Sequence, residues 1–126
     1  MKNIIYLIAI IFLTVSCDST YENIIDDPQI IGTWHRYSYT ESGVESAEND
    51  SIVYHFINDG RLIIKYYADQ GASLPDENYQ FDLQNGILRY WNADLNVSAE
   101  KEITISGSLL RIKMYSNFYY NLDKIF

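Results

Sequence analysis

Few side chains in this sequence could carry out covalent or metal chemistry. The 126 residues include one cysteine, Cys17, and two histidines, His35 and His55. A single thiol excludes an internal disulfide and a multi-cysteine metal site. Each histidine falls in a predicted strand, on the face opposite the main apolar residues, where a solvent-facing side chain is the simpler interpretation. The sequence has no Gly-x-Ser-x-Gly motif, glycine-rich phosphate loop or EF-hand spacing, so we predict no catalytic residue, no metal site and no enzyme.

The position of Cys17 gives its thiol a more specific chemistry. Lys2 supplies a positive charge, residues 4–15 form an apolar run, and the cysteine follows directly. The run is shorter than the ~20 residues that cross a bilayer, and it fits the ~7–15-residue core of a secretory signal. Residues 13–17 (LTVSC) resemble the lipobox of bacterial lipoproteins, although Leu13 lies one place further from the cysteine than usual.

This resemblance implies a lipid anchor. Residues 1–16 would be a signal peptide with a helical core, and Cys17 would be acylated, for example with palmitate, after cleavage. The protein would then be held by covalent lipid on a membrane of the bacterial cell envelope, with the outer membrane as the expected one. The alternatives are an ordinary signal peptide with a chance cysteine and an uncleaved anchor helix.

Composition narrows the possible partners. The net charge of −8 disfavours nucleic acid, which is bound through positive charge, and gives no attraction to anionic lipid surfaces. Twelve tyrosines, five phenylalanines and two tryptophans can still build a substantial core. No cofactor is indicated beyond the covalent lipid, and the sequence identifies no protein partner.

Residues 17–29 form the predicted link between anchor and domain. The stretch is acidic, lacks strand or helix periodicity and is ended by Pro28. We interpret it as a tether, and its twelve residues after Cys17 would reach about 40 Å when extended. The alternative is that Ile24 and Ile25 dock back onto the domain, since two exposed isoleucines are unfavourable in a free linker.

Residues 30–126 show period-2 alternation of apolar and polar side chains, which is typical of half-buried strands. Short turns are predicted at Asp59-Gly60, Asn85-Gly86, Ser106–Ser108 and Ser116-Asn117, and longer loops at 41–50, 68–76 and 92–99. The predicted strands are 30–40, 51–57, 61–67, 77–83, 87–91, 101–105, 109–115 and 118–125.

Eight strands joined largely by short turns predict an all-β, antiparallel up-and-down meander, because short turns connect antiparallel neighbours. Closure into a barrel removes both exposed edges and is the favoured architecture, with an open curved sheet or a sandwich as the alternative. Two strands leave their inner face undecided. Either Leu88 and Tyr90 or Ile87 and Trp91 could point inward, and the strand at 118–125 has the same ambiguity.

Gly32-Thr33-Trp34 opens the first predicted strand and resembles the Gly-x-Trp motif of lipocalins and fatty-acid-binding proteins. In those families the tryptophan packs across one end of an antiparallel barrel. The resemblance implies a lipocalin-like β-barrel over residues 30–126. The chain is shorter than true lipocalins and lacks their packed helix, and for the basic residue that backs the tryptophan only Arg111 and Lys124 are candidates.

An eight-stranded barrel is either filled by its own side chains or holds one small ligand. We predict non-enzymatic binding of a small apolar or aromatic ligand inside the barrel. The same side chains could simply be core, in which case the protein would be a filled-barrel interaction module, either a subunit or an inhibitor. The predicted ligand-lining residues are Trp34, Tyr54, Phe56, Leu62, Ile64, Tyr66, Tyr79, Phe81 and Tyr90.

Overall fold

The computed structural model describes residues 23–67 and 74–126. The predicted signal helix, Cys17 and the first part of the predicted tether lie outside the described residues. So does most of the predicted loop at 68–76.

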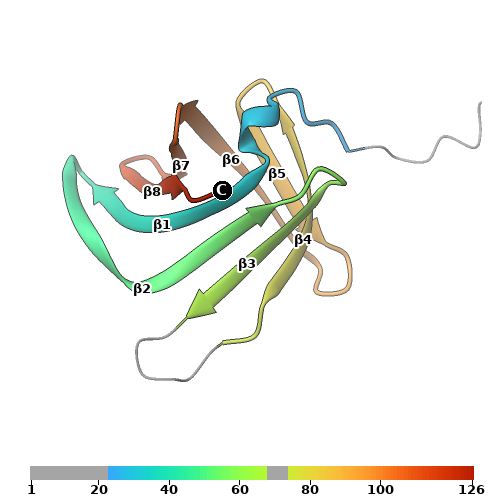
Figure 1. Cartoon of the computed structure of the whole chain (residues 1–126), viewed down its shortest axis with the longest axis horizontal. Coiled ribbons are helices and arrows are strands. Elements are labelled where there is room, and N and C mark those ends of the chain that lie inside the picture. Colours follow the sequence, from blue (N-terminus) through green and yellow to red (C-terminus); the bar gives the residue numbers. More distant parts are fainter. Residues whose placement is uncertain (1–22, 68–73) are drawn as a thin grey trace, which may run out of the picture.

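Eight antiparallel strands form one closed barrel, in which each strand pairs with the next along the chain and β1 pairs with β8 (Figure 1). This confirms the predicted all-β meander and its closure. The strands are β1 (Gly32–Glu41), β2 (Val44–Phe56), β3 (Arg61–Tyr67), β4 (Glu77–Gln84), β5 (Ile87–Asn92), β6 (Val97–Ser106), β7 (Leu109–Tyr115) and β8 (Phe118–Lys124).

The largest difference from prediction concerns residues 41–50, which were expected to form a loop. Instead the chain turns at Ser42 and Gly43, and β2 begins at Val44. Both turn residues have positive φ, 50° and 81°, as a tight hairpin turn requires. The prediction was wrong because the first half of β2 is polar and mostly exposed, so it lacks the alternation that marks a half-buried strand. In the same way, β6 begins at Val97 inside the predicted loop at 92–99.

Strand register resolves the two undecided faces, since residues directly opposite each other on neighbouring strands point to the same side. Leu88 is opposite Leu83 and fully buried, so Leu88 and Tyr90 point into the barrel. Leu122 is opposite Leu110 and is also fully buried. Phe118, Tyr120 and Leu122 therefore form the inner face of β8.

One end of the barrel, here called the Trp34 end, contains the turns at 57–60, 85–86 and 107–108. It is closed by η1 (Pro28–Ile30), a 3-10 turn that places the fully buried Ile30 over the interior. Trp34 Nε1 donates a 2.8 Å hydrogen bond to the carbonyl oxygen of Ile30. The buried apolar core consists of Ile30, Trp34, Ile52, Tyr54, Phe56, Leu62, Ile64, Phe81, Leu83, Leu88, Leu110, Ile112 and Leu122.

The described part of the predicted tether lies against β4. Ile25 forms a parallel bridge with Leu83, and the backbone hydrogen bonds Leu83 N to Ile24 O (2.7 Å) and Asp26 N to Leu83 O (2.9 Å) flank it. Ile25 packs against the core, whereas the side chain of Ile24 stays half exposed. Residues 24–26 thus extend the sheet beyond the start of β3, as the docking alternative expected for Ile25.

Candidate binding site at the tyrosine end of the barrel

The predicted ligand-lining residues all lie on the inner wall. Register places them together, because Tyr54 is opposite both Trp34 and Ile64, Leu62 is opposite Phe56 and Tyr79, and Phe81 is opposite Tyr90. Tyr66 is opposite the buried Ile52 and shares this face.

These residues divide between two environments. Trp34, Phe56, Leu62 and Phe81 are completely or almost completely buried near the Trp34 end, where Phe56 and Phe81 pack edge to face at 5.2 Å between ring centroids. Tyr54 and Ile64 are buried further along the barrel. Trp34, Phe56, Leu62 and Phe81 are packed core, so we do not place a ligand between these side chains.

The opposite end of the inner wall, here called the tyrosine end, is lined by the half-buried residues Tyr66, Tyr79, Tyr90 and Tyr120. Tyr79 and Tyr90 pack edge to face with centroids 5.0 Å apart. Tyr79 Oη donates a 2.8 Å hydrogen bond to Glu77 Oε2. The tyrosine end therefore combines apolar ring faces with hydroxyl groups that can donate or accept hydrogen bonds.

The pKa values of four inner-wall phenols, those of Tyr54, Tyr66, Tyr79 and Tyr90, are raised. Burial, followed by the negative charge and hydrogen bonding of Glu77, raises the pKa of Tyr66 to about 12. Burial and then the Glu77 hydrogen bond raise the pKa of Tyr79, and burial with the Glu77 charge raises that of Tyr90. Burial alone is the main cause of the raised pKa of Tyr54. These four hydroxyls therefore stay neutral into the alkaline range, beyond the pH at which a solvent-exposed tyrosine ionises.

Arg36 is an inner-wall residue that the sequence analysis missed. It is opposite the buried residues Ile52 and Leu122, and its guanidinium lies 4.0 Å from the ring centroid of Tyr120. Its Nε is 3.1 Å from Glu48 Oε2, yet the buried N–H is not aligned with any hydrogen-bond acceptor in the described residues. Spacing could have indicated Arg36, which follows Trp34 by two residues. Glu48 had no such signal, because it fell in the predicted loop.

The positions of Lys124 and Arg111 distinguish these two candidates for the basic residue behind Trp34. Lys124 Nζ lies 5.5 Å from the Trp34 ring centroid. Arg111 is on the outer wall, where its guanidinium lies over Tyr119 at 4.5 Å and its Nε donates to Asn121 Oδ1 at 3.2 Å. Lys124 therefore occupies the expected place at the closed end.

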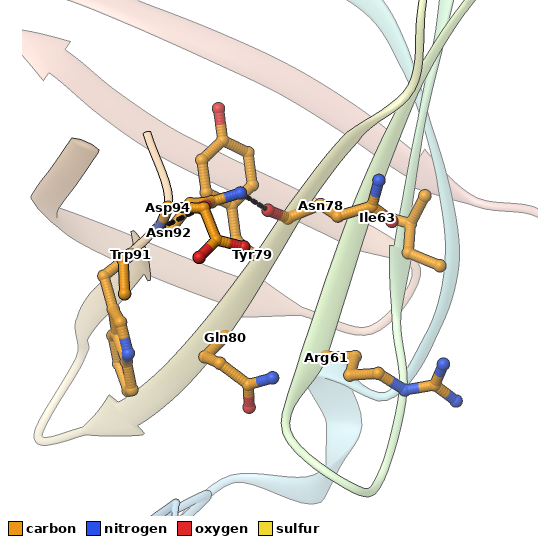
Figure 2. Close-up of a pocket in the computed structure, with 9 residues that line it drawn as sticks. Arg61, Ile63, Asn78, Tyr79, Gln80, Trp91, Asn92 and Asp94 are labelled. Atoms are coloured by element: carbon orange, nitrogen blue, oxygen red, sulfur yellow. Dashed lines mark hydrogen bonds between the residues drawn. The ribbon is translucent and has the colours of Figure 1, made fainter. Parts of the chain in front are cut away.

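Hollows also occur on the outer wall. One of about 310 Å³ lies across β3, β4 and β5, where Trp91 is opposite Gln80 and Asn92 Nδ2 donates a 2.7 Å hydrogen bond to the carbonyl oxygen of Asn78 (Figure 2). Another of about 430 Å³ lies beside Ile31, Ile57 and Ile63. From the predicted ligand-lining set these two hollows include only Tyr79 and Phe56, respectively.

The histidines lie outside the barrel interior. His35 Nδ1 is 3.5 Å from Asp123 Oδ1, and His55 Nδ1 is 2.9 Å from the hydroxyl of Thr33. Burial and the nearby charge of Lys65 lower the pKa of His55. Across residues 23–67 and 74–126, no three His, Cys, Asp or Glu side chains are grouped as metal ligands would be.

No helix in the described part of the chain has the length and apolar character needed to cross a membrane. Comparison of the chain with protein-family models, curated proteins and solved structures finds no match.

Proposed function

We propose that this protein is a lipid-anchored component of the bacterial cell envelope whose barrel binds a small, mainly apolar or aromatic ligand at the tyrosine end. Binding would be passive, so no bond is made or broken. The observation that supports this is the difference between the two barrel ends. The Trp34 end is filled by buried side chains, whereas Tyr66, Tyr79, Tyr90 and Tyr120 remain half buried on the inner wall at the other end.

Tyrosine suits such a site because it combines a large apolar ring with one hydroxyl, so it can contact an apolar ligand and orient its polar group. Covering the exposed part of these rings would contribute about 25 cal/mol for each Å² of apolar surface removed from water. Because the interior is packed at the Trp34 end, the ligand would enter only from the tyrosine end.

Native mass spectrometry of the protein purified from its host tests the ligand. We expect a small molecule to be retained by the natural chain and lost from the Tyr66→Ala variant. Tyr67→Ala is the matched control, since Tyr67 is the next residue of β3, points outward and is half exposed. A chain that carries no molecule and takes up no apolar fluorescent probe would contradict ligand binding.

The anchor is supported by the lipobox resemblance at residues 13–17. The Cys17→Ser variant should leave the membrane fraction or accumulate as an unprocessed precursor, because it lacks the thiol that would be acylated. If the variant is processed and membrane-bound as before, the anchor is not lipid on Cys17.

A second candidate function is protein interaction through the hairpin tips at the tyrosine end. The β1–β2 and β7–β8 tips touch through a 2.8 Å hydrogen bond from Ser42 N to Asn117 O. Val44 and Tyr115 are 66% and 71% exposed there. Apolar side chains this exposed are typical of an interaction surface when they gather in one patch. Loss of a copurifying envelope protein from a Tyr115→Ala variant, with ligand retention unchanged, would favour this candidate.

A further inference from the structure

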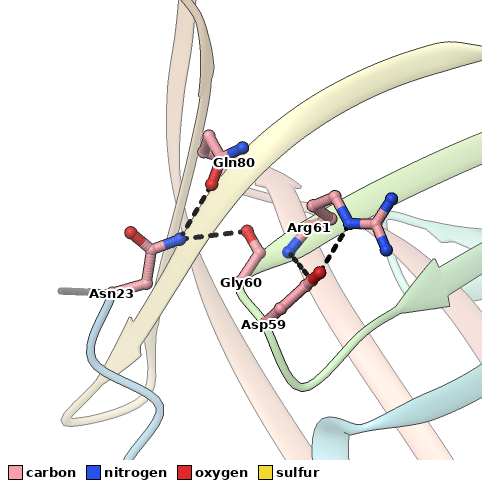
Figure 3. A network of polar contacts seen from close by, with 5 residues as sticks. All are labelled: Asn23, Asp59, Gly60, Arg61 and Gln80. Atoms are coloured by element: carbon pink, nitrogen blue, oxygen red, sulfur yellow. Dashed lines mark hydrogen bonds and ion pairs between the residues drawn. The ribbon is translucent and has the colours of Figure 1, made fainter.

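The chain enters the described structure at Asn23, and this residue is held by the barrel wall. Asn23 Nδ2 donates hydrogen bonds to the carbonyl oxygen of Gly60 at 3.0 Å and to Gln80 Oε1 at 3.2 Å (Figure 3). Gly60 belongs to the β2–β3 turn and Gln80 to β4. The first described residue is therefore already attached to the β2–β3 turn and to β4.

The following residues continue this attachment. Ile24 N donates to Asp82 Oδ1 at 2.9 Å, and Asn85 N donates to Asp26 Oδ2 at 2.7 Å. Together with the parallel bridge between Ile25 and Leu83, these contacts fasten residues 23–26 along β4. The segment behaves as a short additional strand and not as a free linker.

The β2–β3 turn leaves room for the Asn23 side chain because residue 60 is a glycine. Gly60 has φ of +90°, which favours glycine, and a Cβ at this position would collide with the side chain of Asn23. The close approach of Asn23 thus depends on the absence of a side chain at residue 60.

Docking at Asn23 shortens the length of chain between Cys17 and the barrel. From Cys17 to Asn23 the chain makes six steps, which span at most about 20 Å. A link that stayed free as far as residue 29 would reach about 40 Å. The attachment point on the β2–β3 turn and β4 is thus confined to roughly half the distance from Cys17 that the unattached tether would allow.

We propose that residues 23–26 hold the barrel beside the lipid surface, with the wall formed by the β2–β3 turn and β4 facing the bilayer. This inference rests on the lipid anchor proposed above. In the closed strand order β8 lies across the barrel from β4, so the β7–β8 turn at Ser116 and Asn117 faces away from the membrane. The hollow beside Trp91 on β3–β5 then lies on the membrane side, next to Gln80.

Energy transfer to acceptor-labelled lipid tests this orientation in the full chain, purified with its own anchor and reconstituted in phosphatidylcholine vesicles. A fluorophore is attached through Asn58→Cys, near the docked segment, or through Asn117→Cys, in the β7–β8 turn. Acylation consumes the only natural cysteine, so each introduced thiol is the sole labelling site. We expect transfer from residue 58 to exceed transfer from residue 117 at least twofold.

A release variant separates docking from the anchor itself. Asn23→Ala combined with Asp26→Ala removes the hydrogen bonds made by the segment's own side chains, and the transfer ratio should fall toward one. Asp50→Ala is the matched control, because Asp50 is exposed on β2 away from the docked segment, and it should keep the original ratio.

The outcomes distinguish the two proposals. Protein that fails to float with the vesicles contradicts the lipid anchor and this inference together. Protein that floats but gives equal transfer from residues 58 and 117 contradicts the inference alone. If the release variant keeps the original ratio of transfer from residues 58 and 117, docking does not orient the barrel.

Discussion

Arg36 Nε lies 3.1 Å from Glu48 Oε2 inside the barrel, and the two side chains are only 11% and 14% exposed. The pair spans the place where the β1–β2 register shifts between Arg36 and Ser38. Tyr120 covers the guanidinium from β8. A largely buried ion pair therefore links β1 and β2 on the inner wall where their pairing is irregular.

Removing one partner of this pair should destabilise the barrel. Glu48→Gln would leave the Arg36 charge largely buried without a counter-charge, and we expect a loss of about 1–3 kcal/mol in the free energy of unfolding. Urea denaturation measures it. Glu100→Gln is the matched control, because Glu100 pairs with Arg89 at the surface, with both side chains about 60% exposed, and should change the free energy by less than about 0.5 kcal/mol.

Two glycine substitutions separate backbone strain from loss of docking. Gly43 and Gly60 both have positive φ, so alanine should cost about 1 kcal/mol at either turn. Only at Gly60 would the new Cβ also collide with Asn23, whereas Gly43 has open space around it. We expect Gly60→Ala to be more destabilising and to speed hydrogen exchange at the Asp26 and Leu83 amides. Equal exchange in both variants would mean that residue 60 does not control docking.

The tryptophan that closes the barrel should contribute through its ring nitrogen as well as its size. Trp34→Phe removes the hydrogen bond to the buried Ile30 carbonyl and leaves space in the core, so we expect a loss of about 1–3 kcal/mol in thermal or urea unfolding. Tyr115→Phe removes a hydroxyl from a 71% exposed residue and should have little effect. An unchanged midpoint for Trp34→Phe would show that η1 closes the barrel without this bond.

Because inner-wall tyrosines have raised pKa values, we expect the barrel to lose stability at alkaline pH. The pKa of Tyr66 is about 12 in the folded barrel and near 10 in an unfolded chain, and burial also raises the pKa values of Tyr54, Tyr79 and Tyr90. Above pH 10 the unfolded state binds fewer protons than the folded state, so the free energy of unfolding should fall as pH rises from 10 to 12. Urea midpoints at intermediate pH values measure the fall, and Tyr66→Phe should make it shallower.

Much of the barrel could be predicted because its strands carry local signals. β3 and β7 match their predicted ranges, since alternating apolar residues end at turns with unambiguous chemistry. Asn85 and Gly86 both take positive φ in the hairpin that their residue types predict. The polar start of β2 carried no such pattern, because its side chains are mostly exposed and its pairing with β1 is a property of the backbone.

The amino-acid sequence by itself determined the all-β class, the order of the strands and the face that most strands turn inward, because these follow from alternation and turn residues. It also placed the predicted ligand-lining side chains on one wall. Only the tertiary structure decided that this wall divides into a packed Trp34 end and a half-buried tyrosine end, and that Arg36 and Glu48 meet inside. It alone showed Asn23 bound to Gly60 and Gln80. These contacts join residues far apart in the chain, so no local pattern in the sequence encodes them.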